Sequence, residues 1–421
     1  MVWVGALIVI VTFVAIVRQY ETRMVLFVSG LLMCIVGAGG LQGFVIAIDT
    51  FGKTMVHHAL VPIICSVMGF AYVMKLTKCD AHLVHLLAGR LGSLGPALVP
   101  MAVLVTYAVN IALPSAAGCA AAVGAVLIPT LIGAGVHPAV AASAVMAGTW
   151  GGVFNPGASH NPFIAKLAGT DPMSVIAVHT APALVGMVIV AVSLTLIAIV
   201  RKENQGYASP EVVRADDGFQ VNVIKAIVPL MPLLLLLLGS KQINVLPWAI
   251  TVPQAMILGV FLGFLTTLSN PSEVSKQFFA GLGEAYGGVI GIIIAAAVFT
   301  MGMESIGLTK ALIDAMKNSQ QIAQIGATFG PFIIAVLCGS GDAATLAFNG
   351  AITPHAQSFG YGIMEMGSTA FLTGALGRTM SPVAGAAIVC AGIARINPIE
   401  ISKRNAPGCI LAAIATMLIL L

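Results

Sequence analysis

Two ionisable residues, Arg378 and Asp342, occur in stretches of the sequence that are otherwise almost free of charge. Arg378 lies in "LGRTMSP" (376–382) and Asp342 in "CGSGDAAT" (338–345). If these stretches cross a membrane, an ionised side chain at mid-depth costs at least about 2.5–3.5 kcal/mol, which argues for a functional role. A guanidinium fork can receive a substrate carboxylate through two hydrogen bonds. The alternative is a structural salt bridge between Arg378 and Asp342, and Asp342 can equally carry a coupling proton or bind a coupling cation.

Composition predicts a membrane setting for these residues. The chain has 421 residues, of which 59% are hydrophobic and 8% charged, and its mean hydropathy is +1.03. Apolar runs of about 20 residues recur, each long enough to cross a bilayer as a helix. These values are typical of an all-α polytopic membrane protein, and the small net charge of +4 predicts no nucleic-acid partner.

The predicted spans fall into two similar sets. Each half is predicted to have five crossings and one re-entrant hairpin, with the hairpins turning at "LPSAAG" and "CGSGD". In the first half the spans are 2–17, 24–47, 58–76, 138–165 and 175–200, with the hairpin at 96–113 and 118–132. In the second half they are 221–238, 246–268, 280–303, 363–394 and 406–421, with the hairpin at 323–357.

An internal repeat supports this division. Ser115 lies 14 residues before Pro129, and Ser340 lies 14 residues before Pro354, so both pairs share an offset of 225. "AGTWGGVFNPGA" (147–158) aligns with "TGALGRTMSPVA" (373–384) at an offset of 226. Five crossings is an odd number, so the two repeats are predicted to be inverted in the membrane. Inverted repeats with interrupted helices are typical of secondary transporters.

The predicted domains follow from the repeat. The first repeat is 1–200, with scaffold helices in 1–95 and a hairpin and broken helix in 96–170. A cytoplasmic linker is expected at 201–220. The second repeat is 221–421, with scaffold helices in 221–303 and a hairpin and broken helix in 323–394. Positive charges agree with an outside N-terminus, because the cytoplasmic loops would then carry most of the Lys and Arg residues. These residues are Arg18, Arg23, Lys75, Lys78, Arg90, Arg201, Lys202, Arg214, Arg395, Lys403 and Arg404.

The four interruptions supply the predicted site. Backbone that leaves a helix cannot face lipid, so these stretches must face protein or water. Half-helix N-termini favour an anion, and freed carbonyls can coordinate a cation. Small polar residues add ligands, although each has an equally simple role in close packing or in bonding freed backbone groups. The polar residues at or next to the breaks are Ser115, Asn155, Ser159, His160, Ser340, Thr345, Thr379 and Ser381.

Several of these stretches resemble a known family. "LGRTMSPVAGAAIVCAGIARINPIEISKRNAP" (376–407) is similar to the corresponding part of the DcuC-type C4-dicarboxylate carriers, a branch of the ion-transporter superfamily. "LPSAAGCAAAVGAVLIPTLIGAGV" and "CGSGDAATLAFNGAITPHA" resemble the two hairpin regions of that family. The resemblance implies secondary transport of fumarate, succinate, malate or a similar dicarboxylate across a bacterial inner membrane. It also implies a homodimer in which a transport domain moves like an elevator. Asp342 and "FNPGASHNP" depart from the family pattern.

We therefore predict a symporter or exchanger for small dicarboxylates, coupled to H⁺ or Na⁺, with no other cofactor and no metal site. Arg378 is expected to bind one carboxylate and the hairpin tips the other. The predicted substrate site comprises Ser115, Ala116, Asn155, Ser159, Ser340, Gly341, Asp342, Arg378, Thr379 and Ser381, and the predicted ion-coupling residues are Asp342, Ser115, Ser340 and His160.

Three other functions compete with this prediction. A cation/proton antiporter of the same superfamily would use Asp342 as its ion ligand and Arg378 as a structural counter-charge; among carriers, another organic anion is the alternative to a dicarboxylate. An intramembrane enzyme is disfavoured because the sequence has no HExxH motif. A passive channel is disfavoured because inverted hairpins are typical of alternating access.

Overall fold

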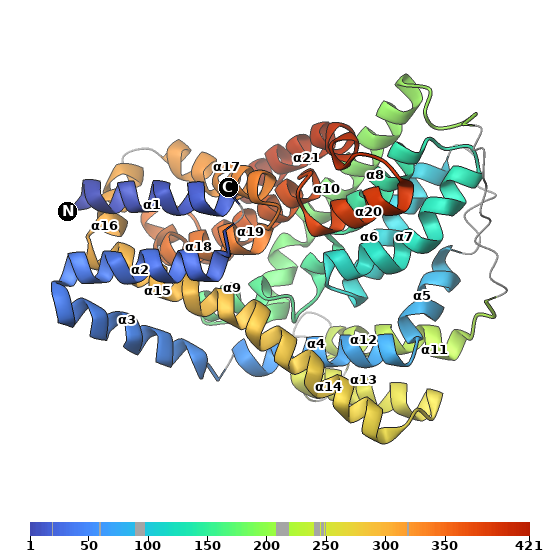
Figure 1. The fold of residues 1–421 in the computed structure, drawn as a ribbon, viewed down its shortest axis with the longest axis horizontal. Helices are drawn as coiled ribbons and strands as arrows, with labels where there is room; N and C mark the ends of the chain where they lie inside the picture. The colour runs from blue at the N-terminus through green and yellow to red at the C-terminus, as the bar shows by residue number, and fades with distance from the viewer. Residues whose placement is uncertain are drawn as a thin grey trace.

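The computed structural model describes residues 1–421 except 19, 59, 89–96, 208–218, 240–244, 246–247, 249 and 318–319. All regular elements in the described residues are helical, as predicted (Figure 1). The helices of the first half are α1 (Val2–Val17), α2 (Thr22–Ala38), α3 (Gly40–Met55), α4 (Leu60–Leu76), α5 (Cys79–Ala88), α6 (Leu98–Ala112), α7 (Ala116–Gly133), α8 (Pro138–Gly148), α9 (His160–Ala168) and α10 (Pro172–Val200).

The helices of the second half follow a similar order. They are α11 (Val223–Ile227), α12 (Met231–Leu238), α13 (Val252–Thr267), α14 (Pro271–Ala285), α15 (Gly291–Ser305), α16 (Leu308–Lys317), α17 (Gln320–Cys338), α18 (Gly341–Ala351), α19 (Ile363–Thr379), α20 (Gly385–Ala394) and α21 (Pro398–Leu420). A π-helical turn, Tyr286–Ile290, joins α14 to α15. In Figure 1 these two helices form one long diagonal element that runs from beside α2 and α3 to the lower edge of the view near α13.

Two helical hairpins turn where the sequence predicts them. α6 and α7 meet at 113–115, where Pro114 has no N–H group to continue a helix. Ser115 then caps α7, because its hydroxyl accepts a hydrogen bond from the Gly118 N–H at 3.2 Å. α17 and α18 meet at Gly339, which has a φ of +75° and lies against the backbone of Val383. A side chain at Gly339 would be strained and would also collide with that backbone.

Helices also stop at both predicted breaks. α8 ends at Gly148, a 3-10 turn follows at Gly151–Phe154, and α9 begins at His160. α19 ends at Thr379 and α20 begins at Gly385. The predicted continuous stretches 138–165 and 363–394 are therefore pairs of shorter helices, as the sequence motifs require.

Other predicted boundaries need correction. The single span predicted at 24–47 is wrong, because Gly39 and Gly40 take positive φ angles and separate α2 from α3. The span predicted at 280–303 is the second part of a longer element that begins at Pro271. The span predicted at 406–421 begins earlier, at Pro398, since Pro407 lies inside α21 without ending it. The span predicted at 246–268 begins at Val252.

Five helical segments among the described residues are long and apolar enough to cross a membrane singly. α3 and α4 form a further candidate that is bent by 50°. Five crossings per half, and the inverted orientation of the halves, stay predictions. The five segments are Ala116–Gly133, Pro172–Val200, Pro271–Ser305, Gln320–Cys338 and Pro398–Leu420.

The described helices pack around three main apolar cores. α6, α7, α8, α10, α19, α20 and α21 share one apolar core, in which α10 lies along α21 and α7 along α20. α1, α2 and α15 share a second core with the hairpin α17–α18, and α4, α13 and α14 form a third. The hairpin α17–α18 thus packs on both sides, against α19 and against α15.

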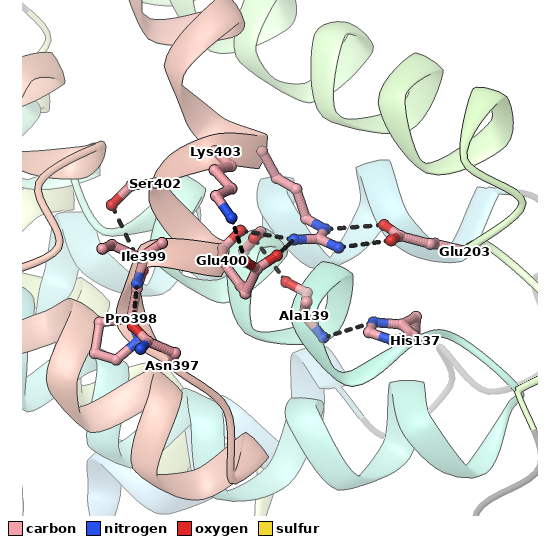
Figure 2. A network of polar contacts seen from close by, with 11 residues as sticks. His137, Ala139, Glu203, Asn397, Pro398, Ile399, Glu400, Ser402 and Lys403 are labelled. Atoms are coloured by element: carbon pink, nitrogen blue, oxygen red, sulfur yellow. Dashed lines mark hydrogen bonds and ion pairs between the residues drawn. The ribbon is translucent and has the colours of Figure 1, made fainter.

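A polar cluster of Arg404, Glu203, Glu400 and Lys403 joins α21 to the end of α10 (Figure 2). The Arg404 side chain is only 3% exposed and binds both carboxylate oxygens of Glu203, at 2.6 and 2.8 Å. It also donates to the backbone and side-chain oxygens of Glu400, at 2.8 Å each. The Glu203 carbonyl in turn accepts the His137 N–H at 2.8 Å. This cluster fixes the start of the predicted linker.

The rest of the linker 201–220 is described only at its second end, because 208–218 lies outside the described residues, as do Arg90 and Arg214 of the predicted cytoplasmic loops. At that end the ring of Phe219 stacks on His85 at 4.2 Å, against α5. The linker therefore begins on α21 and the α7–α8 loop and ends on α5.

Replacing Arg404 by methionine should lower the free energy of unfolding by about 3 kcal/mol, because it leaves Glu203 and Glu400 without their shared buried partner. Thermal unfolding in detergent micelles measures the change. Lys403→Met is the matched control, since Lys403 is 57% exposed and such a pair contributes about 0–1 kcal/mol. Equal losses in the two variants would contradict this account.

Candidate functional site

A cavity of about 270 Å³ lies where the hairpin tips and the helix breaks come together. The first tip contributes Pro114, Ser115 and Ala116, and the second contributes Gly341 and Asp342. Arg378 lines it from the end of α19, and the first break contributes Thr149, Trp150, Gly152, Val153, Gly157, Ala158, Ser159 and His160. Since liquid water occupies roughly 30 Å³ per molecule, the cavity has room for a small organic ion with a few waters. Apolar side chains of α4, Ile64, Val67 and Met68, close it on the scaffold side.

Arg378 is oriented by the break of the other half. Its guanidinium donates to the Thr149 carbonyl oxygen at 2.8 Å and, more weakly, to the Thr149 hydroxyl at 3.4 Å. The Thr149 carbonyl is free because α8 ends at Gly148. Among the described residues, no nitrogen of Arg378 lies within 4.0 Å of a carboxylate oxygen. Arg378 is therefore held by backbone while its charge stays unpaired at the cavity.

Asp342 pairs with His160 instead. The His160 Nε2 lies 2.9 Å from the Asp342 Oδ1, and the His160 side chain is 3% exposed whereas that of Asp342 is 58% exposed. The imidazole packs on Phe371, with ring centroids 4.3 Å apart. This contact joins the first break to the second hairpin tip, so the structural salt bridge between Arg378 and Asp342 that the sequence left open is not formed.

Side-chain amides hold the first break in shape. The Asn110 Oδ1 accepts the Gly152 N–H at 2.7 Å, and its Nδ2 donates to the Leu113 carbonyl at 2.8 Å. Asn161 donates to two further carbonyls of the break. Gly151 has no room for a side chain, because a Cβ there would lie 2.1 Å from the Tyr107 carbonyl. The break is thus a defined loop pressed against α6.

The structure brings seven of the eleven predicted substrate-site and ion-coupling residues to one cavity. The members that line it are Ser115, Ala116, Ser159, His160, Gly341, Asp342 and Arg378. Asn155 lies behind the wall, where its Nδ2 donates to the Ile111 carbonyl and its Oδ1 accepts the Gly157 N–H. Thr379 donates to the Ala375 carbonyl within its own helix. Ser381 accepts the Val383 N–H, and Ser340 begins α18 just outside the wall.

The wall also contains residues that the sequence motifs did not identify, among them Asn110, Thr149 and Phe371. Asn110 had a signal, since it is a lone amide in an apolar helix just before "LPS". Thr149 and Phe371 had none, because a hydroxyl and a ring in such helices are common packing residues.

A second, larger cavity of about 740 Å³ shares Met68, Pro114 and Ser115 with the first. The first hairpin tip is therefore the wall between the two. Lys75 and Asp80 line the second cavity near the α4–α5 junction, and Glu284 lines it from α14. No group of three or more His, Cys, Asp or Glu side chains within the described ranges is arranged to hold a metal.

The fold and this cavity define a multi-pass helical membrane transporter with interrupted helices. The fold resembles the crystal structure of the Alcanivorax borkumensis YdaH transporter, with a TM-score of 0.63 at 16% sequence identity. That similarity covers 95% of this chain and 97% of the other.

Sequence comparison gives the family. Residues 3–421 match the model of the DcuC family, C4-dicarboxylate anaerobic carriers, and the chain belongs to this family. A putative uncharacterized transporter of Haemophilus influenzae is 40% identical over 281 residues, covering 64% of this chain and 100% of that relative. The anaerobic C4-dicarboxylate transporter DcuC of Escherichia coli K12 is 24% identical, covering 99% of this chain and 96% of that protein.

Family membership confirms the predicted resemblance and the predicted class. The chain is a transporter rather than an enzyme, and it is a multi-pass protein of the inner membrane.

Asn110→Leu should loosen the first break, because it leaves the buried Gly152 N–H and Leu113 carbonyl without partners at about 1–3 kcal/mol each. We expect a lower unfolding temperature and faster hydrogen exchange at the Gly152 amide. Thr106→Val, one turn earlier on α6, is the control, since its hydroxyl only supplements a helical carbonyl. Unchanged exchange at Gly152 in Asn110→Leu would refute the assigned role.

Proposed function

We propose that this protein is a secondary active transporter of small dicarboxylates of the fumarate, succinate and malate type, using alternating access of the elevator kind. The observation that carries the proposal is the unpaired Arg378 guanidinium at a small cavity built from both breaks and both hairpin tips. Family membership and the relatives named for C4-dicarboxylate transport support the same substrate class.

Two anion receptors face this cavity. Arg378 offers guanidinium donors that are already oriented by Thr149, which reduces the ordering cost of binding a carboxylate. The start of α7, at Ser115 and Ala116, offers free N–H groups and the positive end of a helix dipole. A substrate with two carboxylates can use both, which favours a dicarboxylate over a monocarboxylate.

The access route that we propose runs past the first hairpin tip. Ser115 lines both cavities, and the second cavity lies on the side of Lys75, which is predicted to be cytoplasmic. Coupling to H⁺, to Na⁺ or to counter-transport of a second anion belongs to the proposal, as does the homodimer expected from the resemblance.

The elevator movement is supported by the contact between α15 and the second hairpin. Gly350 of α18 lies against Thr300 and Phe163, and a Cβ at Gly350 would lie 2.8 Å from the Thr300 hydroxyl. Gly157 of the first break lies as closely against Val67 of α4. Close contacts through glycine leave few side chains that must interlock, which would let α18 and the first break slide past α15 and α4.

The cation/proton antiporter stays the second candidate, because the His160–Asp342 pair at the cavity could exchange an ion alone. Flux that depends on a cation gradient and is unaffected by added dicarboxylate would favour this function. Flux that requires a dicarboxylate would exclude it.

Arg378→Ala should abolish uptake of labelled succinate or fumarate into proteoliposomes, since the cavity then has no fixed positive charge. Arg378→Lys should restore only a small part, because an ammonium cannot form the two-pronged contact. Thermal unfolding shows whether each variant is folded. Uptake that persists in folded Arg378→Ala would overturn the substrate role.

The double variant Thr300→Cys/Gly350→Cys tests the movement. The ideal Cβ at Gly350 lies 3.9 Å from the Thr300 Cβ, within the range of about 3.5–4.5 Å for a disulfide. Oxidation should stop uptake and reduction should restore it, whereas each single variant should be insensitive to the oxidant. Uptake that continues with the cross-link formed would contradict sliding between α15 and α18.

A further inference from the structure

The central cavity presents an exposed negative charge as well as a positive one. Asp342 and Arg378 both line it, yet no ion pair joins them among the described residues. Arg378 donates a hydrogen bond to the Thr149 carbonyl, which carries no charge. Each charge therefore remains available to a bound molecule.

One carboxylate oxygen of Asp342 is free to bind a cationic group. Oδ1 is engaged by His160, whereas Oδ2 has no hydrogen-bond partner in the described part of the chain, and the side chain is 58% exposed. Asp342 also lies in the first turn of α18, where the helix dipole favours a negative charge. The carboxylate is thus held in position by one oxygen and open at the other.

His160 holds Asp342 through one carboxylate oxygen and leaves the other oxygen open. The imidazole Nδ1 is buried and has no partner, and Phe371 covers the ring. The ionisable groups that face this region are Asp342, Arg378 and, behind Phe371, His179. The contacts therefore assign the proton to Nε2, which donates to Asp342.

Comparison of the halves shows that this carboxylate is an addition to the shared backbone plan. The offset of 225 places Asp342 opposite Ala117, and the offset of 226 places Arg378 opposite Gly152. The start of α7 is consequently free to receive a carboxylate, whereas the start of α18 already has one of its own. The cavity offers two receptors for anions and one for a cation.

We propose that the cavity selects dicarboxylates that also bear an ammonium group, amino dicarboxylates of the aspartate type, and that Asp342 receives the ammonium. This inference rests on the dicarboxylate function proposed above and specifies its substrate. Succinate brings two negative charges to a cavity whose Arg378 and Asp342 charges cancel. Aspartate brings one net negative charge and pairs its ammonium with the free oxygen of Asp342, an interaction strengthened where water is excluded.

Binding of L-aspartate and succinate to the purified full-length protein tests this inference, because the two ligands differ by one ammonium group. Isothermal titration should show that the unaltered chain binds L-aspartate at least about tenfold more tightly than succinate. Asp342→Asn, which keeps the shape of the side chain, should reduce the difference to about threefold or less. Asp342→Ala, which copies Ala117 of the first half, should do the same if the asparagine variant does not fold.

Asp49→Asn is the matched control, because Asp49 is exposed on α3 and lines neither cavity. It removes the same charge and should leave the aspartate preference unchanged. A succinate preference in the unaltered chain, or the same ligand ratio in Asp342→Asn, would overturn the inference. So would an equal loss of both ligands in Asp342→Asn, since that result would make Asp342 a general or ion-coupling residue.

Failure of this inference can be told apart from failure of the proposed function. If Arg378→Ala binds neither ligand while Asp342→Asn keeps the ligand ratio, dicarboxylate binding stands and the ammonium role falls. If Arg378→Ala binds both ligands as the unaltered chain does, the proposed function itself falls.

Discussion

One constraint organises the centre of this protein: a helix that stops inside a membrane leaves backbone N–H and C=O groups that must find partners within the protein. At the first break, Asn110 and Asn161 supply most of these partners. The carbonyl left free at the end of α8 is bound by Arg378 from the second half. The groups that satisfy the broken backbone are therefore also the groups that shape the cavity and aim its positive charge.

The same constraint separates polar from apolar contacts. The hydrogen bonds that hold the breaks join α6, the first break, α18 and α19 to one another. Contacts with the neighbouring α4 and α15 are made by Val67 against Gly157 and by Thr300 against Gly350. Hydrogen bonds are directional and apolar contacts are not. In the elevator movement proposed above, a group of helices linked by the former and surrounded by the latter would move as a unit.

Local signals in the sequence predicted the interruptions well, because proline and glycine act on the backbone where they stand. Pro114, Gly339 and the glycines of the first break mark the turns that the structure contains. The partners of the charged residues could not be predicted in this way. His160 and Asp342 are 182 residues apart and Arg378 and Thr149 are 229 apart, so only the packed fold determines that they meet. Residue type also did not predict where a side chain points, because Asn155 and Thr379 form hydrogen bonds with backbone groups and do not line the cavity.

The two halves share interruptions but differ in charge, and this difference separates the requirements of the fold from those of the cargo. A fold retained at 16% identity and a TM-score of 0.63 cannot depend on many particular side chains. What it needs at these positions is a backbone able to stop and turn, which Gly152 and Ala117 provide as well as Arg378 and Asp342 do. A change of direction in the backbone at the second break and second tip therefore does not by itself require a charge there. Under the proposed function, the chemistry of the transported molecule is a physical reason for placing an arginine and an aspartate at the same small cavity.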